Sequence, residues 1–119
     1  MLVELPAVKA HLRLTYDDAD PAYADLVLDL AGKHAAAEAA VLRWVGKSAH
    51  GLSVIADWTD PAAVPFDAQA AVLIVIGELW RFRGDDPGAA IYTSGRDPGN
   101  DLAPVVIGLL RRFTDPVLA

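Results

Sequence analysis

A long segment with helical hydrophobic spacing, from Asp20 to Gly46, constrains the fold of this chain more than any other feature of its sequence. Asp20-Pro21 is a helix start, because a carboxylate caps free backbone N–H groups and proline fits the first turn. Gly46 is a typical helix stop. Apolar residues recur between them at steps of three and four, which predicts one amphipathic helix. Its predicted buried stripe consists of Tyr23, Leu26, Val27, Leu30, His34, Ala37, Val41, Leu42 and Val45.

Three further segments have helical patterns: residues 6–14, residues 65–83 and a last segment from 102 or 103 to 113. Residues 70–77 are apolar on nearly every side, and so short an apolar run fits a buried strand or a buried helix. The pattern continues helically to Arg83 without a turn, so we predict a helix. A helix apolar all round is buried on several sides, which makes this helix central or shared with a neighbouring subunit.

Two stretches between these segments are rich in glycine and proline. Residues 46–64 are predicted to be a connector, with a brief extended stretch at 52–55 and with Trp58 pinning the connector to the body. Residues 85–103 are predicted to form a long polar loop, and loops of this length are usually functional or disordered. The whole sequence thus predicts one all-α domain over residues 1–119, with four helices, two long and two short, and a long loop before the last helix.

The composition limits the classes of function. A chain of 119 residues with 54% hydrophobic residues builds one modest core and has apolar surface to spare for neighbouring subunits. The net charge of −6 argues against a protein that wraps or reads DNA, because such proteins neutralise phosphates. It is compatible with a pore wall that DNA slides past. The N-terminus lacks the pattern of a signal peptide and residues 70–77 are too short to cross a bilayer, so we expect synthesis in the cytoplasm and no membrane contact.

Catalytic and metal-binding patterns are weak. Asp17, Asp18 and Asp20 resemble the start of a calcium loop, but the glycine and the glutamate that such a loop needs later are missing. The turn is better explained as a helix cap, and His34 as a packed core histidine. The chain has no cysteine, no nucleophile elbow and no glycine-rich phosphate loop after a strand. We therefore predict no catalytic residue, no metal and no cofactor.

Two basic clusters beside aromatic residues remain. Arg81 and Arg83 flank Phe82, and Arg111-Arg112 precede Phe113. Cations near a helix C-terminus offset the helix dipole, and arginine beside aromatic residues is also typical of protein interfaces. Both interpretations stay open at this point.

The order of the motifs resembles the small head-tail connector (adaptor) proteins of long-tailed phages and gene transfer agents. The matching pieces cover nearly the whole chain in sequence order: Lys9-Ala10-His11-Leu12-Arg13, the acidic turn 17–20, the long helix ending at Gly46, the aliphatic helix with Trp80 and Arg83, and the close with Leu109-Leu110, Arg112-Phe113 and Asp115-Pro116. Trp80 stands where the family more often has tyrosine. Residues 85–103 form a loop that varies in length in the family, so the resemblance implies no role for it.

The resemblance implies a helical bundle that assembles as a ring, commonly of twelve subunits, between the capsid portal and the tail of the particle. Such a ring extends the DNA channel, lets DNA pass without specific binding and docks a tail-side connector or stopper protein. We assign three candidate surfaces. The portal contact comprises Arg111, Arg112, Phe113, Val117 and Leu118; the ring interface comprises Lys9, Arg13, Trp80, Arg81, Phe82 and Arg83; the tail-side or channel loop comprises Arg96, Asp97, Asn100 and Asp101.

Alternative functions remain. The first alternative is a DNA-packaging accessory encoded in the same gene neighbourhood. It would bind the terminase or DNA transiently and be absent from finished particles. A small helical DNA-binding regulator would need a basic recognition helix, and the sequence shows no helix of that kind. An enzyme is the weakest alternative, because no catalytic constellation was found.

Overall fold

The computed structural model describes residues 1–81 and 102–114 of the chain. Helices are the regular elements of this part, which confirms the predicted all-α fold. They are α1 (Leu5–Leu12), α2 (Ala24–Val45), α3 (Ala49–Ile55), α4 (Phe66–Arg81) and α6 (Pro104–Leu110), with short 3-10 turns η1 (Pro21–Tyr23), η2 (Pro61–Ala63) and η3 (Arg111–Phe113).

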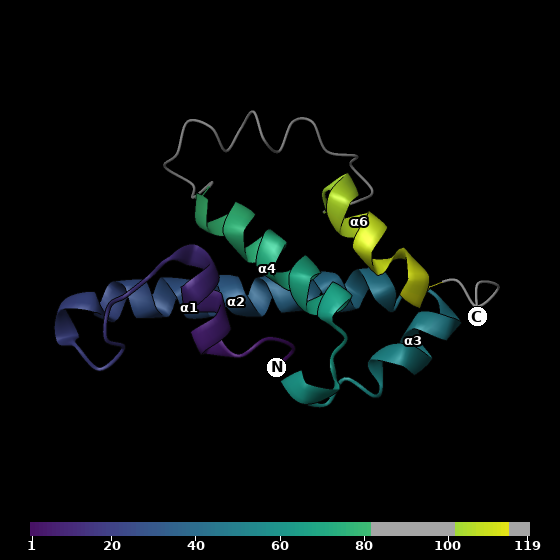
Figure 1. Ribbon diagram of the computed structural model, residues 1–119, viewed down its shortest axis with the longest axis horizontal. Coiled ribbons are helices and arrows are strands. Elements are labelled where there is room, and N and C mark those ends of the chain that lie inside the picture. The colour runs from purple at the N-terminus through teal and green to yellow at the C-terminus, as the bar shows by residue number, and fades with distance from the viewer. Residues whose placement is uncertain (82–101, 115–119) are drawn as a thin grey trace.

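Helix α2 is the long helix that runs along the length of the molecule (Figure 1). The sequence predicted the helix start at Asp20-Pro21. Asp20 Oδ1 does accept the N–H of Ala22 at 3.0 Å, but this cap begins the η1 turn, and α2 itself begins at Ala24. Its 22 residues span about 33 Å at 1.5 Å per residue. Its buried side chains all belong to the predicted stripe: Leu30, His34, Ala37, Val41 and Val45. Tyr23, which the predicted stripe also included, is exposed because it lies in the η1 turn before α2.

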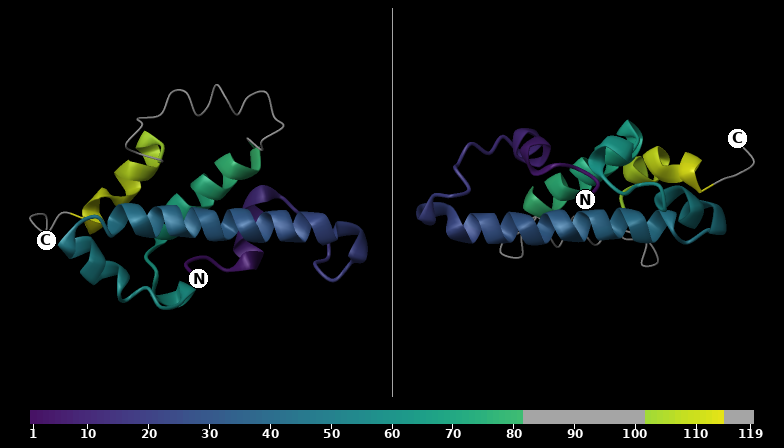
Figure 2. Two further views of the ribbon diagram at one scale, coloured as in Figure 1. Left: turned by 180° about the vertical axis from the view of Figure 1, so that it is seen from behind. Right: turned by 90° about the horizontal axis from the view of Figure 1, so that it is seen from below.

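The helices form two layers. Figure 2 shows, in its view from below, α1, α4 and α6 on one side of α2. The molecule measures 50 × 34 × 17 Å along its principal axes. The shortest of these dimensions matches two layers, because packed helix axes lie 8–10 Å apart and each helix adds its own side chains.

Helix α4 is the central element of the second layer. It packs on α2, on α6 and on α1, as expected for the apolar segment 70–77. The other helices meet each other less, so the core lies where α4 crosses α2. Its buried residues include Val8 of α1, Val41 of α2, five residues of α4 (Ala68, Ala71, Val72, Val75 and Ile76), and Val106 and Leu110 of α6.

The predicted extended stretch at 52–55 is wrong, because these residues belong to α3. The Ser48 side chain accepts the N–H of Gly51 at 2.9 Å and so caps the start of this helix. The capped helix packs against the end of α2, and this tertiary contact outweighs the local β preference of Val54 and Ile55. The described part therefore has five helices instead of the four predicted. The prediction for Trp58 is confirmed, since its side chain is buried in the core.

The N-terminal arm is tied to α2 by a single carboxylate. Glu38 Oε2 accepts the N–H groups of Leu2 and Val3 at 2.5 and 2.9 Å. His34 Nε2 lies 3.2 Å from the same oxygen. His34 is a buried core residue, as predicted. This arrangement satisfies two backbone donors whose residues are buried and fixes the arm beside the middle of α2.

Candidate interaction surfaces

The predicted contact residues fall into two groups. The structure describes Lys9, Arg13, Trp80, Arg81, Arg111, Arg112 and Phe113. The remaining ones lie outside the described residues: Phe82, Arg83, Arg96, Asp97, Asn100, Asp101, Val117 and Leu118. The tail-side surface therefore stays a prediction from sequence, and the other two surfaces can be followed in part.

Lys9, assigned to the ring interface, has partners within its own chain. Its ammonium donates to the Tyr16 carbonyl at 2.7 Å and to Asp18 Oδ1 at 3.1 Å. It also lies 4.6 Å from the centre of the Tyr16 ring. Lys9 thus joins the end of α1 to the acidic turn. The first two pieces of the resemblance, residues 9–13 and the acidic turn 17–20, are therefore in direct contact with each other.

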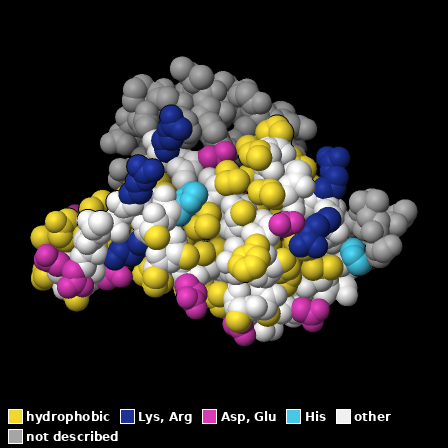
Figure 3. Space-filling model, in the orientation of Figure 1, with side chains coloured by type: hydrophobic (Ala, Val, Ile, Leu, Met, Phe, Trp, Pro, Cys, Tyr) yellow, Lys and Arg dark blue, Asp and Glu magenta, His cyan; other side chains and the backbone are white. Residues whose placement is uncertain are grey.

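The other described members of the ring interface, Arg13, Trp80 and Arg81, lie at the ends of α1 and α4, which pack on each other. Arg13 and Arg81 are exposed, whereas Trp80 is partly buried against the core. Figure 3 shows basic side chains over these two helix ends on one face. The structure thus brings Arg13 and Arg81, distant in sequence, to neighbouring elements.

The predicted portal contact near the end of the chain contains one core residue, Phe113, and two surface residues, Arg111 and Arg112. Phe113 is 5% exposed and packs edge-to-face on Trp58, with ring centroids 5.1 Å apart. Its ring stabilises the domain and is not presented to a partner in this structure. Arg112 donates from Nε to Asp67 Oδ2 at 2.8 Å and covers the Phe113 ring at 4.3 Å. Arg111 is exposed.

Phe66, an aromatic residue that the sequence analysis did not single out, precedes the Asp67 that binds Arg112. Phe66, the first residue of α4, is 87% exposed and is next in sequence to Asp67, which holds Arg112. Phe66 lies outside the apolar stripe of α4, which begins at Ala68. This position in the sequence pattern would have predicted an exposed ring. Aromatic residues, Phe among them, and arginine are enriched in protein interfaces. We call Phe66, Asp67, Arg111 and Arg112 the α4–η3 surface.

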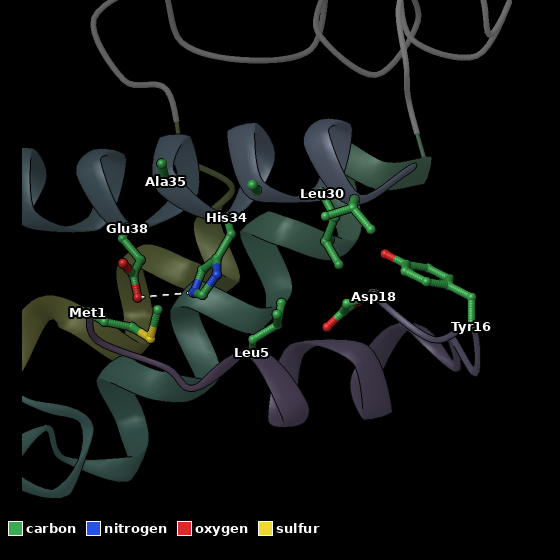
Figure 4. A pocket seen from close by; sticks show the side chains of 10 residues that line it. Met1, Leu5, Tyr16, Asp18, Leu30, His34, Ala35 and Glu38 are labelled. Atoms are coloured by element: carbon green, nitrogen blue, oxygen red, sulfur yellow. Dashed lines mark hydrogen bonds and ion pairs between the residues drawn. The ribbon is translucent and has the colours of Figure 1, made fainter. Parts of the chain in front are cut away.

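A groove lies between α1 and α2 (Figure 4). Its cavity volume is about 260 Å³. The walls are mostly apolar, Tyr16 and Asp18 lie at one end, and His34 and Glu38 lie at the other. The apolar lining residues are Met1, Leu5, Val27, Leu30, Ala31 and Ala35.

The hydroxyl of Tyr16 is the unusual atom of this groove. It is excluded from solvent and has no hydrogen-bond partner among the described residues. Burial, and after it the negative charge of Asp18, raise the pKa of Tyr16 above its usual value. The Tyr16 ring stacks on Tyr23 with centroids 5.4 Å apart. The ring is therefore held in place while its hydroxyl keeps unused hydrogen-bonding capacity.

Within 1–81 and 102–114, no group of three or more His, Asp or Glu side chains is placed to hold a metal ion. No helix in the same part of the chain is long and apolar enough to cross a membrane.

Comparison of this chain with protein-family models, with curated proteins and with solved structures gives no match in any of the three.

Proposed function

We propose that this chain is a structural protein of a tailed phage or phage-like particle, and that it forms an oligomeric ring between the capsid portal and the tail. The ring extends the DNA channel and docks the tail-side connector or stopper protein. The proposal places the protein at the head-tail junction of the particle. Its starting point is the resemblance of the sequence to head-tail connectors.

One observation carries the proposal beyond the sequence pattern: the motifs of the resemblance make specific contacts in one helical domain. Lys9 binds Asp18 of the acidic turn. Arg112 of the closing motif binds Asp67 at the start of α4. Both pairs join segments that are separate in sequence within one domain, which is consistent with the single domain that the resemblance implies. The acidic net charge of −6 suits a channel wall to which DNA does not adhere.

The α4–η3 surface is our candidate for the portal contact. It retains Arg111 and Arg112 from the sequence assignment and replaces the buried Phe113 by the exposed Phe66. A contact with the portal needs a surface that is accessible in the free subunit. Aromatic and arginine side chains are enriched in such protein interfaces. Val117 and Leu118 follow this surface in sequence and remain part of the proposal.

The first experiment deletes the gene in the producing strain and examines the particles by electron microscopy. Separate tails and heads that hold DNA poorly would support the connector role. Empty, unexpanded heads would indicate the packaging-accessory function instead. Normal tailed particles would refute both.

A second experiment tests the portal contact with purified full-length chain and portal protein. Phe66→Ser removes an exposed ring, so the melting temperature should stay within a few degrees of the wild-type value while portal binding falls. Phe113→Leu is the matched control, because it changes a core aromatic that the proposal does not use for binding. It should lower the melting temperature, and folded protein should still bind the portal. Equal portal binding by Phe66→Ser and wild type would refute this assignment.

A further inference from the structure

Helix α2 has a long outer face that the described helices leave open. In the view from below in Figure 2, α1, α4 and α6 lie together on one side of α2. The outer face of a surface helix normally carries charged and polar residues. Here the exposed positions between Asp25 and Arg43 carry no charge: they are Leu28, Ala31, Gly32, Ala35, Ala36 and Ala39. This composition is typical of a helix face that is covered by another helix.

Four of these residues, Leu28, Gly32, Ala36 and Ala39, form what we call the outer row of α2. They follow each other at steps of four and three, so they lie one above the other along the helix. Leu28 is 73% exposed, and a Cβ atom at Gly32 would meet nothing within 4 Å. The outer row therefore has one projecting apolar side chain near its start and a shallow surface along the rest, over which a second helix can approach closely.

The outer row lies between two opposite charges. Asp25 precedes it and Arg43 follows it, and both residues are exposed. The two positions are 18 residues apart, which is five full turns at 3.6 residues per turn. The carboxylate and the guanidinium group therefore lie on the same side of α2, one near each end.

This pattern is complementary to itself when two copies of α2 run antiparallel. With the two helices aligned at about residue 34, Asp25 of each copy lies level with Arg43 of the other. Leu28 of each copy then lies beside Ala39 of the other, so that a large side chain faces a small one. A parallel arrangement would instead place Asp25 against Asp25 and Leu28 against Leu28. Both charge and side-chain size thus favour a second copy of this chain, in antiparallel orientation, as the occupant of this face.

We propose that two copies of this chain pair through the outer row of α2, with the two helices antiparallel. Asp25 of each copy binds Arg43 of the other, and Leu28 packs on Ala39. Such a contact uses the same surface on both copies and closes at two, so it goes beyond the proposed ring and describes the free protein. The α4–η3 surface belongs to the other layer and stays accessible in the pair (Figure 2).

The test is sedimentation velocity of the full-length chain between about 10 μM and 1 mM, because a single helix pair is smaller than a standard interface and binds weakly. Wild type should shift from monomer to dimer across this range. Gly32→Glu places a charge at the centre of the contact and should stay monomeric, and it should remain folded because its side chain enters open space. Gly108→Glu is the matched control, since Gly108 is an equally open helical position on α6. It has the same change of charge and should dimerise like wild type.

Charge reversal tests the antiparallel alignment. Asp25→Arg and Arg43→Asp each bring like charges together at both ends of the pair, so each should weaken dimerisation about tenfold. The double variant restores opposite charges and the net charge of wild type, so its dissociation constant should return to within about twofold of the wild-type value.

Three results would overturn the inference: a wild-type chain that is monomeric at 1 mM, a Gly32→Glu chain that dimerises like wild type, or a double variant that is no tighter than the single ones. The gene deletion judges the connector role by a separate readout, so normal tailed particles would refute that role and leave this pair standing.

Discussion

Replacement of Gly51 by alanine tests whether α3 is packed as described. A Cβ atom at Gly51 would lie 1.8 Å from the carbonyl oxygen of Val45 and 2.9 Å from Ser48 Oγ. Cβ atoms essentially never approach another heavy atom closer than 3.0 Å, so α3 would have to move more than 1 Å away from the end of α2. That movement stretches the bond between Ser48 Oγ and the Gly51 N–H, which caps the helix.

The magnitude follows from three contributions. Overpacking against fixed backbone costs about 1–3 kcal/mol, and loss of the serine cap costs about 1 kcal/mol. Alanine regains roughly 0.5–1 kcal/mol through its higher helix propensity. The net expectation is a loss of about 2 kcal/mol in the free energy of unfolding, which lowers the melting temperature of a domain of this size by roughly 8–10 °C.

The assay is urea and thermal unfolding followed by circular dichroism. Gly32→Ala and Gly108→Ala are matched controls, because a Cβ at either helical position meets nothing within 4 Å. Each control should stabilise the chain by roughly 0.5–1 kcal/mol. A Gly51→Ala chain as stable as wild type, with both controls behaving as expected, would refute the packing of α3 on α2.

Three further predictions follow from side-chain contacts. Glu38→Gln keeps the shape but removes the charge that binds the N-terminal arm, so stability should fall by about 1–2 kcal/mol and the amides of Leu2 and Val3 should exchange faster with solvent. Arg112→Gln should change the free energy of unfolding by less than about 0.5 kcal/mol, because its ion pair with Asp67 is largely exposed; a larger loss in urea unfolding would contradict this. The raised pKa of Tyr16 stabilises the folded state fully below pH ~10, the pKa of an unfolded tyrosine, and this stabilisation is lost as the pH rises through the folded-state value. Unfolding measured between about pH 9 and 11 should therefore show a steeper loss of stability in wild type than in Tyr16→Phe.

Helices α2 and α4 were predictable because each carried its own local signal. Asp20 and Gly46 mark the limits of the long helix, and the buried residues of α2 follow the spacing read from the sequence. The central position of α4 followed from an apolar segment too uniform to face solvent. Helix α3 was missed because its local composition favours an extended chain and its stability comes from a serine cap and from contact with α2.

The candidate surfaces were less predictable. The Arg111-Arg112-Phe113 motif reads as one contact patch in sequence, but the fold buries Phe113 on Trp58 and leaves Phe66 exposed, next in sequence to the Asp67 that binds Arg112. Lys9 reads as a surface cation, but it binds the acidic turn. Side chains adjacent in sequence can point into different environments, and only the packing of the helices decides which of them remain accessible.

The sequence by itself thus determined the class of fold and the main helices, because helix limits and hydrophobic spacing are local properties of a chain. The tertiary structure alone decided that Arg112 binds Asp67 next to the exposed Phe66, that one glutamate holds the N-terminal arm, and that a groove opens between α1 and α2 beside a tyrosine hydroxyl without a partner among residues 1–81 and 102–114. These features depend on contacts between residues far apart in sequence, and such contacts exist only after the helices have packed.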